Sequence, residues 1–183
     1  MKDLSMHIMD LVQNSVRAKS ENVVIAIEAS SKKEILSIEI RDDGSGMSEE
    51  TLIAASDPFG TSRKTRKIGL GLPLFKQATV AGEGNYHIES KVGEGTIVRG
   101  EFRINALDRQ PLGDIGNLIF LLGISGDSDF KLEIISDENK STFEVKKEDK
   151  FDLDRIFGVQ DEINIAVNEM FGGVLPEIGE SLL

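Results

Sequence analysis

The chain has 183 residues, 39 % hydrophobic and 29 % charged, which are ordinary values for a soluble globular protein with a real core. It contains no Cys and only two His, which excludes disulfides and thiolate metal sites and argues against a histidine-based zinc site. No apolar run approaches the ~20 residues that span a bilayer, and the N-terminus does not resemble a secretory signal, so we expect a cytoplasmic protein without a membrane segment.

The net charge of −11 is unevenly shared along the chain. Residues 1–104 hold 14 basic and 15 acidic residues, whereas residues 105–183 hold 7 and 17. A duplex DNA binder needs a basic face, so no nucleic acid partner is expected. A protein partner that docks on the acidic segment should present a basic surface; the alternative is that the acidic excess only keeps the segment soluble.

The N-terminal part alternates helical and strand patterns. Residues 3–18 have apolar positions at helical spacing, and residues 22–29 and 35–41 are typical of strands. The second strand alternates apolar and polar residues, as on a sheet that is covered on one face. A short helix over 49–56, a polar loop over 57–68, a helix over 72–81 and strands over 85–91 and 95–104 follow.

The composition changes at residues 105–113, where Asp, Arg, Gln, Pro and Gly predict a linker. Beyond it we predict a helix over 114–123, strands over 130–136 and 141–147, helical segments near 152–157 and 161–171, and a short C-terminal helix. The expected organisation is therefore one domain over 1–104 and a small acidic C-terminal domain over 105–183, of unknown role.

The first predicted helix has a polar face formed by His7, Asp10, Asn14 and Arg17, at steps of three, four and three. Asp10 and Asn14 lie one turn apart and offer oxygen ligands for a hard cation and a carboxylate that can accept a proton. The alternative is an ordinary solvated helix face.

Three further segments suggest a ligand site. Residues 42–47 place a carboxylate at the end of a strand before a glycine turn, although a plain Asp-Gly turn has the same pattern. Gly69-Leu70-Gly71 opens a helix whose free N–H groups suit phosphate oxygens, and four of the five residues 63–67 before it are basic. Thr96 offers a hydroxyl from a late strand, where a β-branched residue is also favoured for its own sake.

In this order and spacing, the four elements resemble the GHKL superfamily, the ATP-binding domains of DNA gyrase, the large heat-shock chaperone, histidine kinases and MutL. Residues 7–18 are similar to its N box, 42–47 and 69–72 to its two glycine boxes, 57–60 to the start of its ATP lid, and 95–96 to its last box. The resemblance is to stand-alone bacterial members. It implies a two-layer α/β sandwich, with a mixed, mainly antiparallel sheet, helices on one face and an ATP lid, plus a small C-terminal α/β segment.

The resemblance also implies roles for particular residues. Asn14 would coordinate Mg²⁺ and bridge it to the phosphates of ATP, and Asp42 would accept a hydrogen bond from the adenine amino group. Thr96 would support Asp42 directly or through water. The implied nucleotide-binding set also contains Gly44, Gly46, Met47, Phe59, Gly69, Gly71 and Leu72, with Arg63 and Lys67 as lid cations.

Asp10 occupies the position of the catalytic acid, which is Glu in ATP-hydrolysing members and in anti-sigma-factor serine kinases, and a neutral Asn in many histidine kinases. Asp is one methylene shorter than Glu, so slow hydrolysis is expected. Three functions stay open: an ATP-dependent regulator with slow hydrolysis, a kinase that phosphorylates a Ser/Thr or His of a separate partner, and a non-catalytic nucleotide-binding scaffold.

Overall fold

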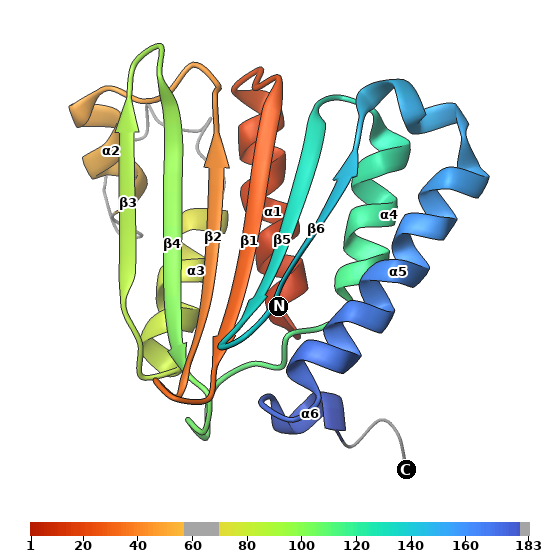
Figure 1. Ribbon diagram of the computed structural model, residues 1–183. Helices are drawn as coiled ribbons and strands as arrows, with labels where there is room; N and C mark the ends of the chain where they lie inside the picture. The colour runs from red at the N-terminus through yellow and green to blue at the C-terminus, as the bar shows by residue number, and fades with distance from the viewer. Residues whose placement is uncertain (57–69, 180–183) are drawn as a thin grey trace.

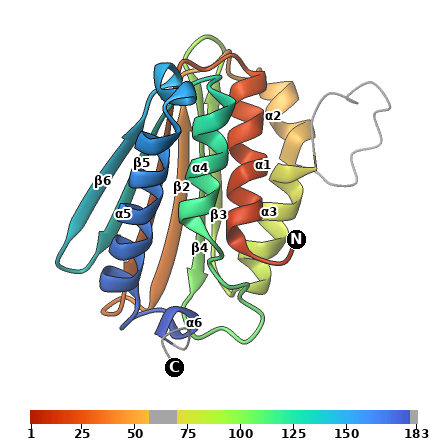
Figure 2. The same ribbon diagram turned by 90° about the vertical axis from the view of Figure 1, so that its right-hand side faces the viewer.

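The computed structural model describes residues 1–56 and 70–179, which form two layers: a sheet and a set of helices that cover one of its faces (Figures 1 and 2). The elements in chain order are α1 (Leu4–Arg17), β1 (Asn22–Ser30), β2 (Ile35–Asp42), α2 (Glu49–Ser56), α3 (Gly71–Ala81), β3 (Tyr86–Lys91), β4 (Gly95–Arg103), α4 (Ile115–Ser125), β5 (Asp129–Ser136), β6 (Lys140–Val145), the 3-10 helix η1 (Lys147–Phe151), α5 (Leu153–Phe171) and α6 (Pro176–Gly179). No helix within these two ranges is long and apolar enough to cross a membrane.

The sheet has six strands in the order β3-β4-β2-β1-β5-β6. The β1–β5 pair is parallel, and the other neighbouring strands are antiparallel. The strand β2 shows why the helices lie on one face: Leu36, Ile38 and Ile40 are buried, and Glu39 between them points to the other side. The predicted mixed, mainly antiparallel sheet with helices on one face is confirmed.

The helix α1 crosses the middle of the sheet and is fixed at its first residue. The side chain of Asp3 accepts a hydrogen bond from the backbone N–H of Met6 at 3.0 Å, which caps the helix. Leu4, Ile8 and Leu11 are buried against the sheet, at the spacing that the sequence predicts. The apolar face of α1 therefore lies on the sheet, as the spacing predicts.

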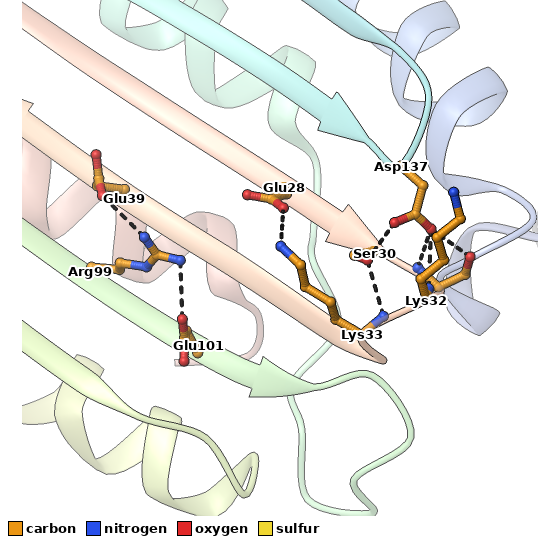
Figure 3. A network of polar contacts seen from close by, with 9 residues as sticks. Glu28, Ser30, Lys32, Lys33, Glu39, Arg99, Glu101 and Asp137 are labelled. Carbon is orange, nitrogen blue, oxygen red and sulfur yellow. Dashed lines mark hydrogen bonds and ion pairs between the residues drawn. The ribbon is translucent and has the colours of Figure 1, made fainter.

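Residues 105–183 add two strands to the same sheet. Ile25 of β1 pairs with Leu132 of β5, and β5 pairs with β6. The turn after β5 is tied to the turn after β1, because the carboxylate of Asp137 accepts hydrogen bonds from Ser30 and Ser31 (Figure 3). These hydroxyl donors hold the pKa of Asp137 well below its ordinary value. The two segments that the sequence separates at 104/105 thus share one sheet and one hydrophobic core.

The face of the sheet opposite the helices carries ion pairs. Arg99 lies 3.1 Å from Glu101 and 3.8 Å from Glu39, and Lys33 lies 3.3 Å from Glu28 (Figure 3). Opposite charges on neighbouring strands keep this face polar.

The predicted linker over 105–113 is fastened to the C-terminal end of the described chain. The guanidinium of Arg109, whose side chain is 6 % exposed, donates two hydrogen bonds of 2.7 Å to the carboxylate of Glu177. Although burial works in the opposite direction, these bonds hold the pKa of Glu177 below its ordinary value. The helix α6 therefore packs back onto the segment between β4 and α4.

The sequence predicts two helical segments near 152–157 and 161–171, and this is wrong: α5 is one continuous helix from Leu153 to Phe171. Gly158 lies inside it. Glycine costs a helix interior about 1 kcal/mol relative to alanine, but Ile156 and Ile163 are buried on either side of it. Burial of these side chains outweighs the glycine.

Candidate functional site

A cavity of about 230 Å³ opens between α1, the ends of β2 and β4, and the loop before α2. Its walls are largely apolar, with a few polar groups that converge on it, as is usual in sites for small molecules. The lining consists of Leu11, Asn14, Ser15, Arg17, Ala18, Ile40, Asp42, Ser45, Gly46, Met47, Thr51, Leu72, Thr96 and Val98. Of the predicted site residues, the cavity thus brings together Asn14, Asp42, Gly46, Met47, Leu72 and Thr96.

The carboxylate of Asp42 is held from two sides. Its Oδ2 accepts a hydrogen bond of 2.7 Å from the hydroxyl of Ser15, and its Oδ1 accepts one of 2.9 Å from the backbone N–H of Gly44. A carboxylate has about four lone-pair positions, so these bonds fix its orientation and leave acceptor capacity for a ligand. Since an ionised carboxylate only accepts, the group selects a ligand with an N–H or O–H donor.

Ser15 is a site residue that the sequence analysis missed. It is 3 % exposed and lies on α1 in the stripe formed by Leu4, Ile8 and Leu11. A hydroxyl at an apolar position of a helix needs a partner, because an unpaired buried polar group is unfavourable. This break in the apolar stripe is the signal that could have identified it.

The glycine turn after Asp42 packs between the end of α1 and the β3–β4 hairpin. Gly46 has φ +63°, and a Cβ there would lie 1.9 Å from the carbonyl oxygen of Lys91. At Gly44, a Cβ would lie 2.8 Å from the Cβ of Ala18. Any side chain at these positions would displace the backbone that shapes the cavity.

Thr96 lies opposite Asp42 in the pairing of β2 with β4 and lines the cavity, as expected. Its hydroxyl, however, bonds with that of Ser90 at 2.9 Å, and Ser90 also accepts a hydrogen bond of 2.9 Å from the backbone N–H of Met47. The hydroxyl that supports Asp42 in the structure is that of Ser15. Thr96 and Ser90 instead hold the loop that carries Met47.

Asp43, next to Asp42, has a different environment. Its carboxylate accepts hydrogen bonds from the backbone N–H groups of Glu21 and Asn22 and from the Asn22 side chain. Although burial works in the opposite direction, the bonds from Asn22 and Glu21 hold the pKa of Asp43 below its ordinary value. Asp42 therefore faces the cavity, whereas Asp43 holds the start of β1 by hydrogen bonds.

The start of α3 packs directly on α1. A Cβ on Gly71 would lie 3.2 Å from the Cβ of Asp10 and 3.5 Å from Nδ2 of Asn14. The N-cap position is Leu70, whose side chain cannot accept a hydrogen bond from the first N–H groups of the helix. The start of α3, and with it the positive end of the helix dipole, therefore lies beside Asn14, where it would attract an anion.

Asp10 lines a neighbouring groove between α1 and α4, while Asn14 lines the Asp42 cavity. The predicted residues Phe59, Arg63, Lys67 and Gly69 lie outside the residues that the structure describes.

His7 on the same helix is buried, with Nε2 at 2.8 Å from the Gln110 side-chain oxygen and its ring 6.0 Å from that of Phe75. Burial lowers the pKa of His7, so the ring is neutral at physiological pH and contributes to packing. Within the described ranges, no group of three or more His, Cys, Asp or Glu side chains could hold a metal ion.

Comparison with known proteins decides which family this arrangement represents. The sequence model of the histidine kinase-, DNA gyrase B- and HSP90-like ATPases matches residues 2–106. The chain belongs to this ATPase family. The match contains the whole cavity, and the resemblance to the GHKL superfamily is confirmed.

Relatives of this ATPase domain occur in bacterial kinases. It is 37 % identical over 93 residues to sporulation kinase D and 29 % identical over 89 residues to sporulation kinase C, both of Bacillus subtilis (strain 168). These matches cover 50 % and 49 % of this chain but only 18 % and 21 % of the two kinases. The N-terminal domain of a DNA repair protein has a similar fold, with a TM-score of 0.51 at 15 % identity, over 78 % of this chain and 52 % of that one.

Proposed function

We propose that the Asp42 cavity binds the adenine of ATP and that the protein is an ATP-dependent regulator. The observation that carries the proposal is the Asp42 carboxylate, oriented by Ser15 and Gly44 and open to a cavity with apolar walls. A flat apolar base with one exocyclic amino group complements this arrangement. Guanine carries a carbonyl oxygen where adenine has the amino group, so the carboxylate would repel it.

The phosphates would extend toward Asn14 and the start of α3, where the positive end of the helix dipole favours anions. Asn14 is the residue that would hold Mg²⁺. Its side-chain oxygen accepts one hydrogen bond, from Arg17 at 3.2 Å, and keeps a second lone pair. One protein oxygen fits this ion, because Mg²⁺ in nucleotide sites usually takes few protein ligands and completes its shell with phosphates and water. The bound ion would neutralise phosphate charge.

Titration calorimetry with the full chain tests the proposal. ATP with Mg²⁺ should bind at least tenfold more tightly than GTP with Mg²⁺, because one charge-assisted hydrogen bond is worth about 1.5–3 kcal/mol. Equal affinities, or no binding of ATP, would contradict it.

Slow hydrolysis is proposed for this regulator, with Asp10 as the general base. Asp10 lies one turn before Asn14 on α1 and next to Gly71 of α3. Its short side chain limits how closely it approaches a water at the γ-phosphate, and such displacements cost about 100-fold in rate. Asp10→Asn should keep the affinity for ATP and lose phosphate release, whereas Asp10→Glu should increase it. Wild-type rates in Asp10→Asn would remove the catalytic role.

A kinase acting on a separate protein is the second candidate, and it is favoured by the sequence identity to the two sporulation kinases. Incubation with γ-labelled ATP, alone and with cell lysate, separates the candidates. Labelled free phosphate indicates hydrolysis, and a labelled protein indicates phosphotransfer. Bound ATP with neither product indicates a scaffold without turnover.

A further inference from the structure

The helices α1 and α4 are neighbours in the helical layer (Figure 2), and two cavities open between them. The two helices start side by side, since the backbone N–H groups of Leu4 and Ser5 donate to the carbonyls of Pro111 and Leu112, immediately before α4. The two cavities have volumes of about 340 Å³ and 500 Å³. Both are lined by Met9 and Leu121, so they are adjacent, and we refer to them together as the α1/α4 groove.

The floor of this α1/α4 groove is apolar and partly open to solvent. Met6 is 46 % exposed and Leu121 is 43 % exposed, and Met9 and Val16 are partly buried against the core. Apolar side chains gathered in a depression mark an interaction site more often than scattered ones do. Methionine side chains are flexible and polarizable and therefore adapt to the shape of a partner.

The rim of the groove is acidic. Asp3, Asp10 and Asp114 line one cavity, and Asp127 lines the other together with Arg17. The lining of the two cavities thus carries four carboxylates and one guanidinium, in a chain whose net charge is −11. A second copy of the chain would bring more negative charge to this rim, so charge complementarity favours a basic occupant.

We propose that the α1/α4 groove binds a basic amphipathic helix of a separate protein. From Met6 to Arg17 the groove follows twelve residues of α1, or about 17 Å, which three turns of a partner helix would fill. Apolar side chains at positions i, i+3 or i+4, and i+7 would meet the methionine floor, and Lys or Arg beside them would meet the rim.

The groove and the nucleotide cavity share α1: Asp10 lines the groove, and Asn14, one turn later, lines the cavity. The partner helix would therefore bind within one turn of the proposed Mg²⁺ ligand on α1, and Arg17 lines both the cavity and the groove. A basic amphipathic helix is therefore the class of partner that we assign to the proposed regulator. Only the coupling to ATP, through Asp10, rests on the proposed function, because binding of a helix to the apolar floor requires no nucleotide.

The test uses synthetic peptides of Lys and Leu as probes, of about 14 residues to cover the groove. One peptide has its Leu residues at helical spacing, and a permuted peptide of the same composition does not. Fluorescence anisotropy measures their binding to the full chain without nucleotide. The double variant Met6→Ser/Leu121→Ser replaces the two most exposed apolar side chains of the floor and leaves the charge unchanged. Ile165→Ser, at a 57 % exposed position of α5, is the matched control.

The amphipathic peptide should bind at least tenfold more tightly than the permuted one, and the double variant should lose at least tenfold, while Ile165→Ser stays near wild type. If both peptides bind wild type equally, or if the double variant binds the amphipathic peptide as tightly as wild type does, binding is charge attraction alone and the proposal is overturned. Absence of any peptide binding would overturn it as well. If wild type sediments as a dimer and the double variant as a monomer, the groove would be assigned to a second copy of the chain instead. If the double variant does not fold, the single variant Leu121→Ser replaces it in the same measurements.

The same samples separate this proposal from the proposed function. The double variant should bind ATP as wild type does, because neither Met6 nor Leu121 lines the Asp42 cavity. Peptide binding by a protein that fails to bind ATP would contradict the nucleotide site and leave the groove in place.

Discussion

Asp42→Asn is expected to remove most of the affinity for ATP and to leave the fold intact. The substitution keeps the shape of the side chain and replaces one carboxylate oxygen with an NH₂ group. The N–H of Gly44 can only donate, so the remaining oxygen should stay with it. The NH₂ group then faces Ser15, whose hydroxyl can turn and accept. Both internal hydrogen bonds survive, and the lost group is the charged acceptor for the ligand.

The magnitude follows from that loss. A hydrogen bond to a charged group is worth about 1.5–3 kcal/mol, and each 1.4 kcal/mol is a factor of ten, so the Kd for ATP should rise by about 10- to 150-fold. Calorimetry of both proteins with ATP and Mg²⁺ measures the change. Thermal unfolding of the two proteins should give similar Tm values.

Asp43→Asn is the matched control, because it changes the neighbouring residue in the same way. Asp43 holds the backbone of Glu21 and Asn22 and does not line the cavity. This variant should lower the Tm and leave the Kd unchanged. The assignment of adenine recognition to Asp42 fails if its variant binds ATP within twofold of wild type, or if Asp43→Asn weakens binding equally.

Four further substitutions test other parts of the structure. Asn14→Ala should make the affinity for ATP equal in Mg²⁺ and in EDTA, and calorimetry that still shows tighter binding with Mg²⁺ would refute its role as ligand. Gly158→Ala should raise the free energy of unfolding in urea by about 0.5–1 kcal/mol, because its new Cβ meets nothing within 4 Å; Gly126→Ala, at φ +61°, should lower it. Glu177→Gln should cost about 3 kcal/mol at neutral pH because it leaves Arg109 without its carboxylate. The folded-state pKa of Glu177 lies below its ordinary 4.5, so wild type loses this contribution to stability as the pH falls below 4.5. Urea titrations at decreasing pH should therefore show the free energies of unfolding of the two proteins converging.

Much of the fold was determined by local signals in the sequence. The apolar spacing in residues 3–18 predicts a helix that the structure begins at Leu4 and ends at Arg17, and alternation in residues 35–41 predicts a strand that the structure places at Ile35–Asp42. Both signals depend only on neighbours a few residues apart. The glycines that form the cavity wall are also visible in the sequence, since Gly44 and Gly46 follow the end of a strand directly. Their order and spacing, together with Asn14, indicated the family.

Other features depended on residues far apart in the chain. Alternation shows which side chains of a strand face the core, but not which strand lies beside it. The sequence therefore separates residues 105–183 as a domain, whereas the structure pairs β5 with β1 in parallel. Similarly, the glycine at 158 suggests a break, and only burial of Ile156 and Ile163 against the rest of the core explains one helix.

The sequence thus determined by itself most of the elements, the family and six residues of the cavity lining, because each has a signal within one helix, strand or turn. The tertiary structure decided which groups touch: Ser15 with Asp42, Thr96 with Ser90, and Arg109 with Glu177. It also turned Asp10 toward the α1/α4 groove while Asn14, on the same polar face, lines the cavity. These contacts arise when the helices pack on the sheet, and hydrogen bonds between distant residues leave no periodic pattern in the chain.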